Sequence, residues 1–159
     1  MTTLYVRDRT GFREAQRDEV IQQAHALIAR QFRVGSPVLS TPSKTREFLR
    51  LHLGPLDHEV FGVLHLDVRT RLIAVEDLFR GTVDSAAVHP REVVKSALRH
   101  GSNSLIAYHN HPSGIAASSP ADDFITRRLV DALALVEIRL LDHLIIAKEI
   151  YSYAEAGLL

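Results

Sequence analysis

The fold is best predicted from the segment Leu105-Ile106-Ala107-Tyr108-His109-Asn110-His111-Pro112-Ser113-Gly114. Its apolar first half predicts a buried β-strand, and the proline and glycine that follow break the strand and turn the chain. Because side chains at positions i and i+2 of a strand point to the same face, His109 and His111 should emerge side by side where the strand ends. A carboxylate, Asp122, follows after a short loop. Two imidazoles and one carboxylate fill three places of a tetrahedral Zn²⁺ shell and leave the fourth open, as in hydrolytic zinc sites.

Length and composition restrict the class of protein. A chain of 159 residues fits one domain with a sizeable core. Its 19 Lys and Arg balance 19 Asp and Glu, which disfavours a protein whose main task is to bind DNA phosphates. The lack of cysteine excludes disulfides, thiolate zinc sites and a cysteine nucleophile. Residues 1–13 are polar, with charges of both signs, and no apolar run is long enough to span a bilayer, so we expect a soluble cytoplasmic protein.

The N-terminal part of the chain predicts an arm and two helices. Residues 1–11 have no clear period and predict a loosely held arm. Apolar residues recur at helical spacing over residues 13–32, which predicts an amphipathic helix. Its apolar stripe could form a homodimer contact or cover the sheet. A short second helix is predicted from Thr41, as its cap, with Pro42 in the first turn, to about His52.

The rest of the chain alternates between strand and helix patterns. We predict strands at 59–67, 72–79, 105–109, 138–147 and 150–153, a loop or short strand at 81–88, and helices at about 89–101 and 119–136. Strands flanked by helices in this order predict an α/β fold, a single-domain mixed β-sheet sandwiched by helices. We divide the chain into an N-terminal arm and helix, residues 1–39, and one domain, residues 40–159.

A hydrolytic site also needs a base and a donor to the oxyanion. Glu59 is the candidate base, because it opens an otherwise apolar strand, where packing alone does not explain a charge. Ser119 could donate a hydrogen bond to the oxyanion that forms when water adds to a carbonyl. Simpler roles stay open for these residues: Ser119 as a helix N-cap, Asp122 as a carboxylate that favours the helix dipole, and Glu59 as a solvated strand end.

Other histidines are expected to be structural. His65 lies inside a strand and is predicted to be a hydrogen-bonded interior histidine. His143 is predicted to form a buried pair with Asp142, its neighbour in the sequence. His100 falls near the end of a helix, where a surface or capping role is expected.

The segment 109–114, followed by Ser119 and Asp122, resembles the JAB (also MPN+ or JAMM) metalloprotease motif. Within that superfamily the chain is similar to RadC-type bacterial domains from about Ser40 to Leu159. Further matches are His58-Glu59-Val60-Phe61, Leu78-Phe79-Arg80-Gly81-Thr82, Pro90-Arg91-Glu92-Val93-Val94-Lys95, Leu141-Asp142-His143 and Ala154-Glu155-Ala156-Gly157-Leu158-Leu159. The resemblance implies a mixed sheet between helices, the JAB/MPN architecture, which is related to that of cytidine deaminases. Deaminase chemistry itself is disfavoured, because its zinc ligands include cysteines.

The resemblance also implies roles for single residues. His109, His111 and Asp122 would hold one Zn²⁺ per chain, Glu59 would be the general base and acid, and Ser119 would steady the tetrahedral intermediate. Full-length RadC-type proteins usually carry an N-terminal helix-hairpin-helix region, whereas this chain has a single predicted helix before residue 35.

The function that we expect is a zinc-dependent metallohydrolase that cleaves a peptide or isopeptide bond in a protein or peptide substrate. The alternative is a DNA-repair-associated nucleic-acid-binding or accessory protein with a structural metal, which the neutral net charge disfavours. A third alternative is an inactive interaction module. No membrane partner is expected.

Overall fold

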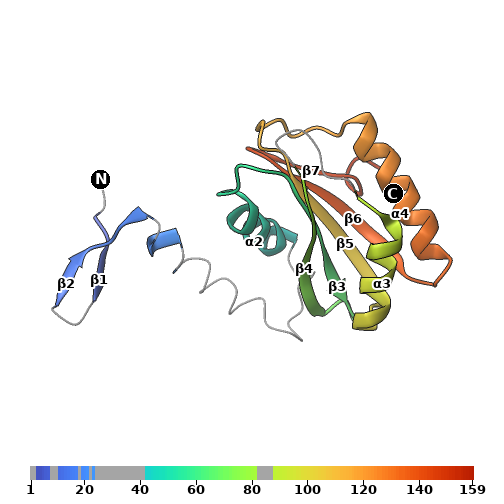
Figure 1. Cartoon of the computed structure of the whole chain (residues 1–159), viewed down its shortest axis with the longest axis horizontal. Coiled ribbons are helices and arrows are strands. Elements are labelled where there is room, and N and C mark those ends of the chain that lie inside the picture. Colours follow the sequence, from blue (N-terminus) through green and yellow to red (C-terminus); the bar gives the residue numbers. More distant parts are fainter. Residues whose placement is uncertain (1–2, 8–10, 18, 22, 24–41, 82–87) are drawn as a thin grey trace.

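A five-stranded mixed sheet forms the core of residues 42–159 (Figure 1). The computed structural model describes residues 3–7, 11–17, 19–21, 23, 42–81 and 88–159. The strand order is β4-β3-β5-β6-β7, where β5 and β6 are parallel and the other neighbouring strands are antiparallel. The strands are β3 (Val60–Leu66), β4 (Leu72–Arg80), β5 (Ser104–Asn110), β6 (Arg139–Ile146) and β7 (Ile150–Ser152). The predicted mixed α/β fold is confirmed.

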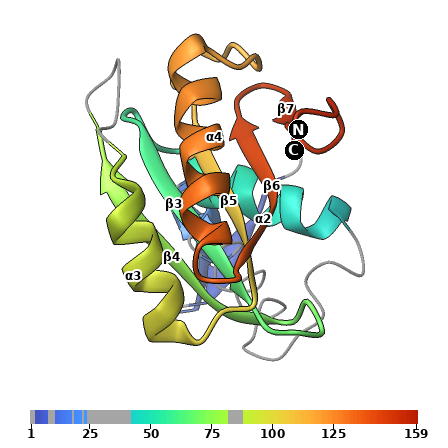
Figure 2. The same cartoon turned by 90° about the vertical axis from the view of Figure 1, so that its right-hand side faces the viewer.

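Helices cover both faces of this sheet (Figure 2). They are α2 (Pro42–Leu53) on one face, and α3 (Pro90–His100) and α4 (Pro120–Ala134) on the other. Every residue of β3 and of β5 is buried, because both strands lie between the two helical layers. Val60, Leu64 and Leu66 pack on the α2 side, whereas Phe61 and Val63 pack on the α3 and α4 side. Alternate residues of β3 thus face two separate hydrophobic cores.

The helices on the second face begin and end where their local sequence predicts. Pro90 opens α3, and Gly101 ends it in the left-handed conformation with φ of 61°, which glycine adopts at little cost. Ser119 caps α4, and its hydroxyl accepts a hydrogen bond from the backbone N–H of Asp122. The Asp122 carboxylate accepts one in return from the backbone N–H of Ser119, which completes a capping box. This box fixes where the Asp122 carboxylate lies.

The N-terminal part differs from its prediction where it is described. Strand β1 (Tyr5–Arg7) pairs antiparallel with β2 (Phe12–Glu14), in place of the loosely held arm. The helix predicted from Arg13 cannot start there, because that residue pairs with Val6. Residues 17, 19–21 and 23 are helical, and the rest of the predicted helix lies outside the described residues.

Two other predictions also lie outside the described residues, namely the cap at Thr41 and positions 82–87 of the predicted loop. The division of the chain between residues 39 and 40 stays a prediction. Within the described ranges, no helix has the length and apolar character needed to cross a membrane.

Candidate metal centre

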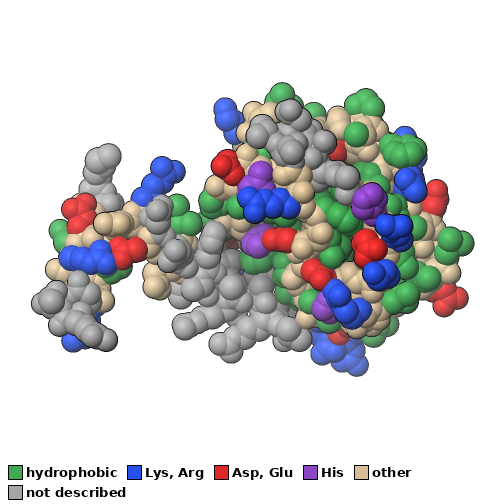
Figure 3. All heavy atoms as spheres, in the orientation of Figure 1, with side chains coloured by type: hydrophobic (Ala, Val, Ile, Leu, Met, Phe, Trp, Pro, Cys, Tyr) green, Lys and Arg blue, Asp and Glu red, His purple; other side chains and the backbone are tan. Residues whose placement is uncertain are grey.

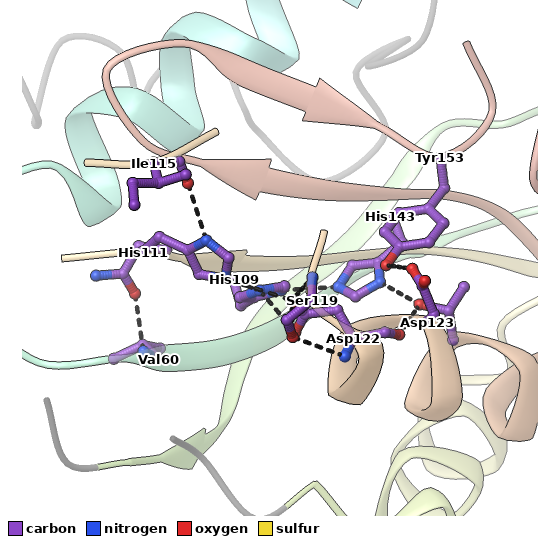
Figure 4. Close-up of polar contacts among 11 residues, drawn as sticks. Val60, His109, His111, Ile115, Ser119, Asp122, Asp123, His143 and Tyr153 are labelled. Atoms are coloured by element: carbon purple, nitrogen blue, oxygen red, sulfur yellow. Dashed lines mark hydrogen bonds and ion pairs between the residues drawn. The ribbon is translucent and has the colours of Figure 1, made fainter. Parts of the chain in front are cut away.

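Three predicted ligands meet where β5 ends and α4 begins (Figure 4). The Nε2 atoms of His109 and His111 are 2.9 Å apart. Oδ1 of Asp122 lies 3.2 Å from His109 Nε2, and Oδ2 lies 3.5 Å from His111 Nε2. His109 is buried and the other two side chains are mostly buried. The structure therefore brings these residues together as expected, and their binding of a metal stays a prediction.

A chain of hydrogen bonds behind His109 fixes which of its nitrogens carries the proton. The Thr126 hydroxyl donates to the Asp122 carbonyl at 2.6 Å, since a carbonyl can only accept. The same hydroxyl must then accept from Nδ1–H of His143 at 2.7 Å. Burial holds the pKa of His143 well below its ordinary value, so this ring is neutral and its Nε2 accepts from His109 Nδ1–H at 2.8 Å. His109 is left with an unprotonated Nε2 that faces Asp122.

The second imidazole is oriented in the same way by the loop that follows it. His111 Nδ1 lies 3.0 Å from the carbonyl oxygen of Ile115, to which it must donate. In their neutral forms His109 and His111 therefore place two nitrogen lone pairs 2.9 Å apart, beside a carboxylate. Such a group of lone pairs repels itself unless a proton or a metal cation lies between them. The residues present thus suit a Zn²⁺ ion, whose usual ligands in catalytic sites include two imidazoles and a carboxylate.

The electrostatics of the cluster favour a positive charge among these groups. Burial alone would raise the pKa of the Asp122 carboxyl, but hydrogen bonds with His109 and His111 hold it well below its ordinary range. The hydrogen bond with Asp122 raises the pKa of His111, and the negative charge of Glu59 adds a smaller contribution in the same direction. Asp122 is therefore ionised, as a metal ligand must be.

Glu59, the predicted base, lies just before β3 and is partly buried. The side chain of Asn110 binds the backbone on both sides of it: its amide N–H₂ donates to the His58 carbonyl at 2.9 Å, and its oxygen accepts from Val60 N–H at 2.8 Å. Gly81 N–H donates to the Glu59 carbonyl at 2.8 Å. The segment that carries Glu59 is thus tied to the strand end that carries the two imidazoles. Its role as a base stays a prediction.

Ser119 is engaged with the candidate ligand. Its hydroxyl accepts from the Asp122 backbone N–H, which makes it the N-cap, and it donates to Asp122 Oδ2 at 2.6 Å, which positions the carboxylate. The role of Ser119 toward an oxyanion stays a prediction, and it requires this hydroxyl to turn away from Asp122.

Comparison with known proteins assigns the chain to a family. The family model described as RadC-like JAB domain matches residues 39–158. The chain belongs to the RadC-like JAB domain family. The resemblance predicted from Ser40 to Leu159 is confirmed, and the mixed sheet with helices on both faces is consistent with the JAB/MPN fold.

Several curated relatives of this RadC-like JAB domain are longer than the chain. A UPF0758 protein of Leptothrix cholodnii is 49% identical over 153 residues, which cover 94% of this chain and 68% of that protein. A UPF0758 protein of Thioalkalivibrio sulfidiphilus is 50% identical over 145 residues, which cover 91% and 65%. One of Cellvibrio japonicus is 50% identical over 143 residues, which cover 89% and 63%. The chain thus spans about two thirds of the length of these relatives.

A groove of about 440 Å³ opens beside the candidate metal centre of this RadC-like JAB domain. His111 forms part of its lining. Leu56 and Pro112, which are partly exposed, contribute apolar surface, and Arg50 and Lys148 contribute positive charge. A ligand in this groove would therefore lie next to one of the candidate metal ligands.

Sequence reasoning missed three residues that support the RadC-like JAB site. Asn110 had no assigned role, although a polar side chain at the end of a fully buried strand is itself a signal. Thr126 was not singled out. The expected ring pairing of His143 with Asp142 is wrong, because adjacent residues of a strand point to opposite faces. The Asp142 carboxylate instead accepts from backbone N–H groups and from Ser152.

Proposed function

We propose that this RadC-like JAB domain is a zinc-dependent metallohydrolase that cleaves a peptide or isopeptide bond. The observation that carries the proposal is the convergence of His109, His111 and Asp122, whose ligand atoms all lie within 4.8 Å of one another. The fixed positions of the imidazole protons support it further, because both Nε2 lone pairs are directed toward the same point. Family membership agrees with this class of chemistry.

Each residue has a distinct task in the proposed reaction. His109, His111 and Asp122 would hold the Zn²⁺ ion, which when bound supplies Lewis acidity and lowers the pKa of water. Glu59 would accept a proton from the attacking water and deliver it to the leaving amine. Ser119 would keep the Asp122 carboxylate in place through its 2.6 Å hydrogen bond.

The groove beside His111 supports a protein or peptide as the substrate. Its partly exposed apolar residues, Leu56 and Pro112, suit an aliphatic side chain next to the bond to be cleaved. Arg50 and Lys148 suit a carbonyl or a carboxylate of the substrate.

The test combines zinc analysis with cleavage of an unbiased peptide library. We expect about one Zn²⁺ per chain at this site in the wild-type protein and its loss in His111→Ala. Glu59→Gln should keep this Zn²⁺ and lose cleavage by about 10²- to 10⁴-fold, the usual contribution of a general acid–base group. Glu137→Gln is the matched control, because that exposed carboxylate follows the far end of α4. Wild-type protein without zinc at this site, or Glu59→Gln with full activity, would overturn the proposal.

A further inference from the structure

A second cluster of metal-binding side chains lies between β3, β4 and α3. His65 of β3, Glu76 of β4 and His100 of α3 offer ligand atoms that all lie within 4.8 Å of one another. Acidic, basic and histidine side chains gather over β4 and α3 on the face shown in Figure 3. In the β3–β5 pairing, His65 faces Leu105, whereas Phe61 faces His109. At about 3.3 Å per residue these positions are roughly 13 Å apart along the strands, so the two clusters are separate.

One carboxylate oxygen is the centre of this second cluster. Oε2 of Glu76 lies 3.4 Å from His65 Nε2 and 3.3 Å from His100 Nε2. It also accepts a hydrogen bond from the hydroxyl of Ser96. The other oxygen, Oε1, forms the ion pair with Arg99. Because the guanidinium contacts Oε1, Oε2 is the oxygen that faces the two imidazoles.

His65, the buried histidine of the cluster, has a hydrogen-bond partner, Ser102, for the ring nitrogen that would not bind the metal. Ser96 donates to the Glu76 carboxylate, so it must accept from His65 Nε2–H at 3.0 Å. Ser102 must then donate to His65 Nδ1 at 2.8 Å. A hydroxyl can exchange these roles, since it is both a donor and an acceptor. If the His65 proton moves to Nδ1, the Ser102 hydroxyl accepts a hydrogen bond from Nδ1–H. The Nε2 lone pair is then free and faces Glu76 and His100. Histidines bound to metals almost always donate their other N–H in this way.

An ion can reach this cluster from solvent. The side chains of Glu76 and His100 are 28% and 29% exposed, whereas His65 is fully buried. Two ligands are thus accessible while the third is held rigidly by the sheet.

We propose that His65, Glu76 and His100 form a second metal site, which takes Zn²⁺ or a chemically similar divalent ion such as Co²⁺. Two imidazoles and one carboxylate favour these ions over Mg²⁺ and Ca²⁺, which prefer shells made of oxygen. The bound ion would tie α3 to the two strands beneath it. This inference goes beyond the proposed hydrolase and does not depend on it.

The test counts the equivalents of Co²⁺ and Zn²⁺ that the metal-free full chain binds. We expect two equivalents in the wild-type protein, one in His111→Ala, one in His100→Ala and none in the double variant. Glu76→Gln should behave as His100→Ala does and serves as the second variant of this site. His52→Ala is the matched control and should keep two, because that imidazole is also bonded to a carboxylate, Asp77 at 3.0 Å, but belongs to neither cluster.

A second readout separates a metal ligand from a purely structural histidine. In the His111→Ala protein, Zn²⁺ should move the His65 proton from Nε2 to Nδ1 in ¹⁵N NMR spectra and should raise Tm, with neither effect in the double variant. A single wild-type equivalent that His111→Ala removes and His100→Ala keeps would overturn the second site and leave the hydrolase standing. A single equivalent that only His100→Ala removes would do the reverse.

Discussion

Replacing Thr126 with valine tests whether the hydrogen bonds behind His109 control the candidate metal centre. Valine keeps the shape of threonine but removes the hydroxyl that accepts from His143 Nδ1 at 2.7 Å and donates to the Asp122 carbonyl at 2.6 Å. The His143 ring is fully buried, so its N–H would then have no partner. A buried donor without a partner costs about 1–3 kcal/mol of the free energy of unfolding.

The loss should extend to the affinity for metal. His143 can avoid an unpartnered N–H only by moving the proton to Nε2, which lies 2.8 Å from His109 Nδ1. His109 would then have to carry its own proton on Nε2, the atom that faces Asp122 and His111. Removing such an outer partner usually lowers metal affinity about 10- to 100-fold, which corresponds to about 1.4–2.7 kcal/mol.

The assay is a competition titration of Zn²⁺ between the protein and a chelator near neutral pH, with chemical denaturation as the measure of stability. It is best done in the His100→Ala background, so that only the centre at His109 is counted. Thr126→Ser is the control, because it keeps the hydroxyl and should bind Zn²⁺ nearly as tightly as its parent. If folded Thr126→Val and Thr126→Ser bound Zn²⁺ equally well, the reasoning about the proton positions would be refuted.

Three further substitutions test the surrounding fold. Gly62→Ala should lower the free energy of unfolding by about 1–3 kcal/mol, because its Cβ would overlap the buried ring of Tyr108; unchanged denaturation would contradict this. Ser119→Ala should cost about 1 kcal/mol through loss of the N-cap of α4, measured in the same way, and a neutral result would show that the cap is dispensable. Asp67→Ala should lower stability near neutral pH, because hydrogen bonds from the Arg71 backbone and side chain hold the pKa of the Asp67 carboxyl below its ordinary value of 3.8. A depressed carboxyl pKa stabilises the fold above that value and ceases to do so as the pH falls through the folded-state pKa, so the difference from wild type should shrink in acid titrations; a constant difference would exclude this cause.

The parts of the fold that could be predicted are those with strong local signals. The run 105–108 that precedes His109 is apolar, and it lies in a strand that is buried throughout. The start of α4 could be predicted from Ser119, Pro120 and Asp122 alone, because a capping box needs only residues within one turn. The three candidate ligands come from these same segments, which is why their proximity could be expected.

The parts that could not be predicted depend on contacts between distant segments. The hairpin of β1 and β2 has only three paired positions, too few for a pattern of alternation to emerge. The partner of His143 is set by the parallel register of β5 and β6, which no local motif encodes. The second cluster joins His65, Glu76 and His100 from three elements, so only the assembled sheet and helix reveal it.

The position of Asp122 links the start of helix α4 to the binding of an ion. One of its oxygens accepts the hydrogen bonds that start α4, and both oxygens face imidazole nitrogens. An ion held there would immobilise the first turn of the helix from outside. Amide protons at the beginning of α4 should therefore exchange with deuterium more slowly once the ion is bound. Their exchange rate would then report how much of the site is occupied, without any substrate.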